Sequence, residues 1–484
     1  MRPADVIVIL LYLVATIAAG LVFRGRAESV DEYFTGRGLF RGRLGEVLIG
    51  LSIAATFLSG ISIIVYVSSA YSDGARIGLG LLCLPISWLV LLRWFLPRYL
   101  AAGGRHPYDV VELRLGYGAR AGLSAMFFLL RVGWMGVMVY VPTLVILGAF
   151  GLGPAWFWPI VLVVGLSSTL YTVVGGIRGV IITDALQFIV ILGGMLLIVV
   201  LLLARLGLSP AEITADLAAR GRLDVLDFSL DPRRPFTFWT VVVGMSVSNL
   251  GAYLADQMSL QRYLASGTPE AAHRAFVVNA AGVAGVIITL VVTGLLLSVW
   301  YARNPAAEVP AKPDLVLGHF IVRELPPGVA GALIAAILAA TMSSMTSAIN
   351  SLAGVITNDW LPRLGRPRTP GELYRFGRRA SLLIGVAATL LSGFAADLGS
   401  VLDVSAKVMG AFLGPMLACI LFAVGGVAVP RSGILIALAA GVSAGWAVAF
   451  SPYASLWVSP VSFSVAGGAG LIARVWFSRA PLPA

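Results

Sequence analysis

Long apolar runs alternate with short polar segments along the whole chain. Because a helix needs about 20 apolar residues to cross the ~30 Å hydrocarbon core of a bilayer, this pattern predicts an all-α integral membrane protein. By the same measure we expect about thirteen transmembrane helices. Their predicted positions are residues 5–23, 45–71, 77–97, 121–149, 155–175, 179–204, 236–255, 275–300, 328–357, 379–396, 401–425, 432–450 and 459–476.

The amino-acid composition also indicates a membrane protein, and it limits the kinds of molecule that the protein is expected to bind. The 484 residues are 59% hydrophobic and only 12% charged, whereas soluble domains carry about 25% charged residues. The net charge of +11 lies in short loops between apolar spans, so we expect membrane lipid as a partner and no nucleic acid. Cys83 and Cys419 both fall inside apolar runs and are predicted to be buried thiols.

The distribution of arginines predicts the orientation of the chain in a cell membrane. Short loops rich in basic residues stay on the cytoplasmic side. Such loops follow the first, third, seventh and ninth helices, and two more arginines lie near residue 484. The N-terminus is therefore predicted to lie outside and the C-terminus inside. These arginines are Arg24, Arg26, Arg37, Arg41, Arg43, Arg98, Arg105, Arg114, Arg120, Arg262, Arg274, Arg363, Arg366, Arg368, Arg375, Arg378, Arg379, Arg474 and Arg479.

The ninth span, around residues 334–359, carries polar side chains where lipid-facing helices carry Leu and Val. Ser343, Ser347 and Asn350 recur at helical spacing on one face, with Ser344 and Ser351 on the adjoining one. Polar oxygens in hydrocarbon are unfavourable unless they bind a partner. The stripe therefore predicts contacts with a ligand or with neighbouring helices.

Two spans contain small polar residues near mid-membrane, at Ser59-Gly60 and at 246–251. Such residues permit a helix to unwind around a cavity or an ion, or simply let helices pack closely. Interruptions at matching places in two halves favour an inverted-repeat transporter with a midplane site. We expect residues 1–44 to form an extra helix and loop, 45–204 and 205–425 the two repeats, and 426–484 the C-terminal helices.

Four motifs resemble those of the sodium:solute symporters. They are Tyr171–Gln187 (with Gly175-Gly176 and Thr183-Asp184), Asp256–Leu264 (Asp-Gln-x-x-x-Gln-Arg-Tyr), Ala339–Ser351, and His106–Gly116. Together they span about residues 30 to 425 in the expected order. The resemblance implies a LeuT-type fold of five plus five helices in inverted repeats, one extra N-terminal helix and two C-terminal helices, and sodium-coupled import by alternating access.

The resemblance also implies a sodium site. Sodium is a hard cation that takes oxygen ligands, and in a membrane these come from unwound carbonyls and from hydroxyls. The family's ligands fall on the carbonyls of Ala55, Leu58 and Ala340 and on the hydroxyls of Ser343 and Ser344. An isolated serine pair would instead bond to its own helix. Asp184 is predicted either to cap a helix after Gly175-Gly176 or to pass sodium toward the cytoplasm.

The substrate is predicted to lie beside sodium. The Ala-Thr-Phe-Leu-Ser-Gly run around Phe57 is similar to that of the branch carrying monocarboxylates, iodide and vitamins, which favours a small carboxylate or other anion. Lys407 either binds that anion or pairs with Asp403, four residues earlier, and Arg131 is predicted to be structural, near the cytoplasmic face. The predicted substrate residues are Phe57, Ser59, Ser62, Asn249, Tyr253 and Lys407.

Other classes of function fit the sequence less well. An enzyme is not expected, because His106, His273 and His319 fall in predicted loops without a Ser or Cys nucleophile beside them. The sequence contains no P-loop or other nucleotide-binding motif, so ATP-driven transport is not expected. The alternatives that stay open are a transport-inactive membrane sensor on the same fold and a symporter of a neutral amino acid or sugar.

Overall fold

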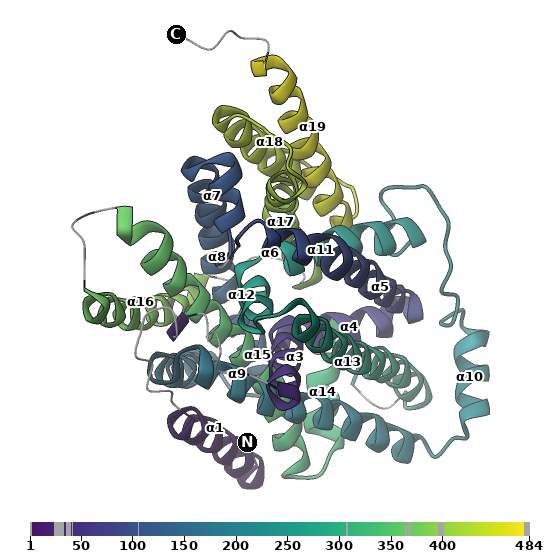
Figure 1. Ribbon diagram of the computed structural model, residues 1–484. Coiled ribbons are helices and arrows are strands. Elements are labelled where there is room, and N and C mark those ends of the chain that lie inside the picture. Colours follow the sequence, from purple (N-terminus) through teal and green to yellow (C-terminus); the bar gives the residue numbers. More distant parts are fainter. Residues whose placement is uncertain are drawn as a thin grey trace.

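The computed structural model describes residues 2–23, 33–34, 40, 42–104, 106–305, 308–363, 365, 369–394 and 401–478, and the regular secondary structure of this part of the chain is helical (Figure 1). Nine further stretches of the described residues have 3-10 or π geometry: Gly74–Leu82, Leu89–Phe95, Pro154–Trp156, Thr240–Gly244, Pro313–Leu315, Val355–Trp360, Leu361–Arg363, Ser392–Phe394 and Ser455–Trp457. The α-helices are α1 (Pro3–Val22), α3 (Gly42–Phe57), α4 (Gly60–Asp73), α5 (Cys83–Trp88), α6 (Leu96–Ala101), α7 (Asp109–Leu115), α8 (Tyr117–Phe150), α9 (Phe157–Leu206), α10 (Pro210–Ala219), α11 (Met245–Leu254), α12 (Gln257–Ala265), α13 (Pro269–Arg303), α14 (Val316–Glu324), α15 (Val329–Gly354), α16 (Pro370–Leu391), α17 (Val401–Gly425), α18 (Arg431–Ala449) and α19 (Val458–Ser478).

Every predicted span overlaps helix among the described residues, although only nine helical stretches there are long and apolar enough to cross a membrane by themselves. The difference has local causes. Two stretches, Gly60–Ala101 and Pro154–Leu206, each contain parts of two predicted spans. The stretch Thr240–Leu254 is short, and α16 carries Arg375, Arg378 and Arg379 in its first half.

The bend between the fifth and sixth spans lies at Gly176, inside α9. Its φ of 55° is a conformation that side-chain-bearing residues rarely adopt. A Cβ added there would also lie 2.7 Å from Tyr33 Cδ2. Glycine at this position therefore permits the kink inside this long helical stretch.

The predicted break in the second span is confirmed. The helix α3 ends at Phe57, and α4 begins at Gly60 with Ser59 as its N-cap. The Ser59 hydroxyl accepts a hydrogen bond from the Ser62 amide at 3.3 Å. Gly60 is required because α15 crosses here: an added Cβ would overlap Thr341 Oγ1 and lie 3.2 Å from the Ile337 carbonyl oxygen.

The predicted break at 246–251 in the seventh span is wrong. The helix α11 runs through these residues and ends at Leu254, and the interruption comes at 255–256, before α12. The small residues serve packing instead: a Cβ on Gly251 would lie 2.9 Å from Leu413 Cβ, and the Ser248 hydroxyl bonds to Ser459 at 2.6 Å. Asp256 then caps α12 by accepting from the Met258 amide at 2.9 Å.

The polar ninth span is α15, which lies in the middle of the bundle (Figure 1). It packs against α9, α1, α8, α16 and α3, and its residues are almost all buried. The C-terminal helices α18 and α19 pack on each other and on α17 at one edge of the molecule. The serines of α15 therefore face other helices and no lipid.

Candidate functional site

The break between α3 and α4 lies against the middle of α15 and brings the predicted sodium ligands together. The Ser343 hydroxyl donates to the carbonyls of Ala55 and Ala340, each at 3.0 Å. All three residues, with Ser344 and Leu58, are at most 2% exposed. Carbonyl and hydroxyl oxygens from two helices thus converge at one buried point, as a neutral cage for a hard monovalent cation requires.

Thr56 belongs to this cluster, although the sequence did not single it out. Its carbonyl accepts from the Ser344 hydroxyl at 3.1 Å, and its own hydroxyl bonds to Ser347 at 2.9 Å. The signal for it was its place between Ala55 and Phe57 in the unwinding stretch. The oxygens that meet here belong to backbone carbonyls and to serine and threonine hydroxyls, which are neutral groups.

Asp184 lies next to this oxygen cluster, to which Ser347 connects it, and is fully buried. One of its carboxylate oxygens, Oδ2, accepts from Ser52 at 2.8 Å, Arg262 at 3.0 Å and Ser347 at 3.2 Å. The helix α9 continues on both sides of Asp184, so the alternative prediction of a helix cap is wrong. Ser347 joins the two clusters, because it also bonds to Thr56.

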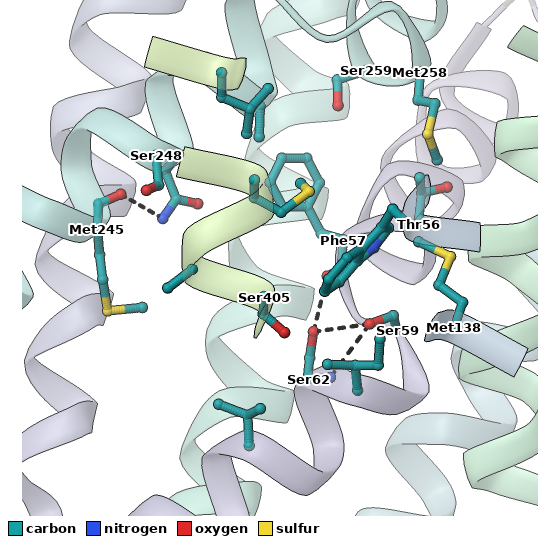
Figure 2. Close-up of a pocket in the computed structure, with 18 of the residues that line it drawn as sticks. Thr56, Phe57, Ser59, Ser62, Met138, Met245, Ser248, Met258, Ser259 and Ser405 are labelled. Carbon is teal, nitrogen blue, oxygen red and sulfur yellow. Dashed lines mark hydrogen bonds between the residues drawn. The ribbon is translucent and has the colours of Figure 1, made fainter. Parts of the chain in front are cut away.

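A cavity of about 250 Å³ adjoins the same helix break (Figure 2). Of the predicted substrate residues, Phe57, Ser59, Ser62 and Asn249 line it. The Ser62 hydroxyl lies 3.3 Å from that of Ser59 and donates to the Phe57 carbonyl at 3.4 Å. The cavity therefore shares its wall with the α3–α4 break that supplies the predicted sodium ligands.

The other two predicted substrate residues do not line this cavity. Tyr253 stacks behind Phe57, with ring centroids 4.2 Å apart, and its hydroxyl accepts from Asn279 at 2.9 Å. Lys407 is half-buried on α17, whose residues Ser405 and Met409 line the wall instead. The side chain of Asp403, its predicted alternative partner, lies outside the described residues.

Arg131 is the charged residue of the cavity wall, and its structural role and its place near the cytoplasmic face stay predictions. It is 6% exposed and forms an ion pair with Asp256 through Nη2. Its Nε is buried and has no hydrogen-bond partner. Periodicity placed Arg131 on a helix, but the face it presents depends on how α8 packs against α4 and α17.

A helix broken beside a crossing helix, with an oxygen cluster and a cavity at the break, defines a secondary transporter of the LeuT type. The model of the sodium:solute symporter family matches residues 33–441, and the chain belongs to that family. It is a multi-pass membrane protein of a transport family and no enzyme.

Individual relatives agree with this assignment. The chain is 29% identical over 429 residues to the human sodium/iodide cotransporter, covering 87% of this chain and 65% of that protein. It is 28% identical to the human sodium-coupled monocarboxylate transporter 2 (86% and 68% covered). It is also 28% identical to the sodium/sialic acid symporter SiaT of Proteus mirabilis (84% and 81% covered). This chain thus spans about two thirds of the length of the sodium/iodide cotransporter.

A solved structure shares the fold over almost the full chain. It is a sodium-coupled sialic acid symporter in a substrate-bound, outward-open state, with a TM-score of 0.87 at 24% identity. The match covers 98% of both chains. It confirms the predicted all-helical LeuT-type architecture.

Proposed function

We propose that this protein is a sodium-coupled symporter that imports a small organic anion, a carboxylate, by alternating access in the cell membrane. Family membership supports sodium coupling. The observation that carries the anion is Arg131, the single charged residue among those that line the cavity, whose Nε has no partner. A guanidinium in the wall of a cavity favours a carboxylate as the ligand.

The apolar side chains of the cavity wall suit the hydrocarbon part of a carboxylate substrate. Trp134, Met138 and Met409 line part of the cavity. Polar groups line the rest, and they come from Thr56, Ser59, Ser62, Tyr66, Ser248, Asn249, Ser259 and Ser405. Methionine side chains adapt to the shape of an apolar group.

Sodium binding and anion binding are coupled through charge in this proposal. Asp256 neutralises part of the Arg131 charge, since the two form a buried ion pair. A sodium ion at Ala55 and Ser343 adds a positive charge next to Phe57, which lines the cavity. Opposite charges attract strongly where water is excluded. Sodium is therefore expected to bind first and to raise the affinity for the anion.

The test is a binding screen on the purified full chain with matched pairs of ligands. Each small carboxylate is compared with its primary amide, with and without sodium, by thermal shift. We expect stabilisation by carboxylates only, and only with sodium present. Equal stabilisation by the amides would contradict the anion and favour a neutral solute.

A second measurement separates a transporter from a sensor. Proteoliposomes are loaded with the stabilising carboxylate, and counterflow of the labelled compound is followed in sodium and in choline. We expect counterflow in sodium alone. Ligand binding without any counterflow would contradict transport and favour the sensor.

A further inference from the structure

The polar stripe of α15 continues well past the predicted sodium ligands. Ser347 bonds to Asp184 and Thr56. One turn further, Asn350 is 2% exposed, and its Oδ1 has no hydrogen-bond partner. Ser351 follows and donates to Gln261 Oε1 at 3.1 Å. Buried oxygens therefore line a path along α15 away from the sodium cluster.

This path ends at a second, much smaller cavity. It is lined by Gln257 and Gln261 of α12, by Gly354 at the end of α15, and by Asn358 and Asp359 in the π segment that follows. Phe34, His106 and Pro107 complete its wall. Its volume is about 10 Å³, and a space of this size is roughly what one water-sized particle occupies. It is distinct from the 250 Å³ cavity at the helix break, with which it shares no lining residue.

Gln257 leaves an unused acceptor at this cavity. Its side chain is 5% exposed, and its amide nitrogen donates to the Ser351 carbonyl at 3.4 Å. The amide oxygen has no partner. The neighbouring Gln261 uses its amide nitrogen on the Phe34 carbonyl. The unused capacity around the cavity is thus an oxygen acceptor, which suits a cation or a water molecule and not an anion.

The charges beside the cavity also favour a cation. Asp359 is 5% exposed and accepts from Arg120 at 2.6 Å and Ser124 at 2.5 Å. Arg120 is shared with two further carboxylates, Asp109 and Glu112. Asp359 therefore places a buried carboxylate in the wall of the cavity, and a negative charge there favours a cation over an anion.

We propose that this cavity is a transient site for a sodium ion that leaves the central cluster toward the cytoplasm, with Gln257 Oε1 and Asp359 as its principal oxygens. The proposal rests on the proposed function and on the predicted orientation, in which the loop that carries His106 and the helix α12 lie on the cytoplasmic side. The ion passes from Ser343 by Ser347 and Asn350 to the cavity, and it meets a polar oxygen at every turn of α15.

The experiment measures sodium from each side in proteoliposomes of the full chain. External sodium is varied to obtain its half-saturating concentration for uptake. Internal sodium is varied to obtain the concentration that halves uptake. In Gln257→Leu, which removes the oxygen, we expect the inhibitory internal concentration to rise several-fold and the external value to stay unchanged. In Gln257→Glu, which adds a charge at the same oxygen, we expect the inhibitory concentration to fall.

A second variant tests the cavity without touching its oxygens. A Cβ on Gly354 would meet Phe34 Cδ1 at 3.4 Å and the Gln257 amide nitrogen at 3.6 Å, so Gly354→Ala fits the fold and narrows the cavity. We expect the same shift as in Gln257→Leu. The matched control is Thr357→Val in the same π segment, because the Thr357 hydroxyl bonds to its own helix at Ala353 and does not line the cavity. We expect wild-type values for this control.

The outcomes separate the two proposals. Unshifted internal inhibition in both Gln257→Leu and Gly354→Ala, with normal sodium-dependent uptake, would overturn the exit site alone. Equal shifts on both sides would also overturn it, because they would show an effect on the central cluster. Absence of sodium-dependent uptake in the wild-type protein would overturn the proposed function and the exit site with it.

Discussion

Individual hydroxyls carry the sodium coupling that we propose. Ser343 and Ser344 each donate to a carbonyl of the broken helix. A hydroxyl that donates one proton still has an acceptor lone pair for an ion. The same two side chains can therefore hold α3 against α15 while also binding sodium, which makes them sensitive to any change.

We predict that Ser343→Ala combined with Ser344→Ala abolishes the stimulation of uptake by sodium. The change removes two hydroxyl ligands and two hydrogen bonds, each worth about 1 kcal/mol of folding free energy. Sodium titration of uptake and of the thermal midpoint checks both effects. The matched control is Ser168→Ala, a buried serine bonded to its own helix at Val164. Unchanged sodium dependence in the double variant would contradict the assignment.

Arg131 and Asp256 are predicted to depend on each other. Removing one member of a buried ion pair costs about 3–5 kcal/mol, since the other charge is left unpaired. We therefore expect Arg131→Gln and Asp256→Asn each to lower the thermal midpoint strongly, and the double variant to recover much of the loss. Carboxylate binding should be lost in both variants that lack Arg131. A double variant that recovers stability and still discriminates carboxylate from amide would contradict the proposed role of Arg131.

The broken helix shows what sequence can and cannot foresee at the scale of an element. Ser59 and Gly60 indicate the break from the sequence alone. Ser59 is the N-cap of α4, and Gly60 permits the close crossing of α4 and α15. The interruption at 255–256 was missed because small residues at 246–251 carry the same local signal. Only the approach of Leu413 to Gly251 shows that they serve packing. Contacts between helices that are distant in sequence decide whether such small residues interrupt a helix or let it pack closely. These contacts cannot be predicted from local sequence.

The crossing at Gly60 gives a prediction for the element. A methyl group there would overlap Thr341 Oγ1 and press on Pro142 at 3.1 Å, and such overpacking costs about 1–3 kcal/mol. We expect Gly60→Ala to push α4 away from α15. The loss of sodium-binding free energy should therefore exceed the loss of folding free energy. Gly133→Ala on α8 is the control, because nothing lies within 4 Å of its added Cβ. Normal sodium affinity in Gly60→Ala would show that the break tolerates movement.

The whole molecule is a bundle of helices, and its central helix α15 carries a stripe of buried polar side chains. The polar stripe in the sequence predicted a buried helix at α15, which the structure confirms, whereas the sodium ligands stay a prediction. The cavity wall was foretold in part: Phe57, Ser59, Ser62 and Asn249 line it, whereas Arg131 was missed and Lys407 lies elsewhere on α17. Side chains from α8, α11 and α17 meet there only through tertiary packing. The division into two repeats at 45–204 and 205–425 stays a prediction.

The last prediction concerns the charge that a complete cycle moves. If one sodium ion at the α3–α15 cluster accompanies one monocarboxylate at Arg131, the two charges cancel and the loaded protein carries no net charge across the membrane. Accumulation should then be independent of membrane potential, whereas one uncompensated charge contributes ~2.3 kcal/mol per 100 mV. That energy corresponds to about a fiftyfold change in accumulation. Proteoliposomes clamped by potassium and valinomycin at two potentials distinguish these cases. A strong response to potential would contradict one-to-one coupling and would direct attention to a second sodium near Asp184.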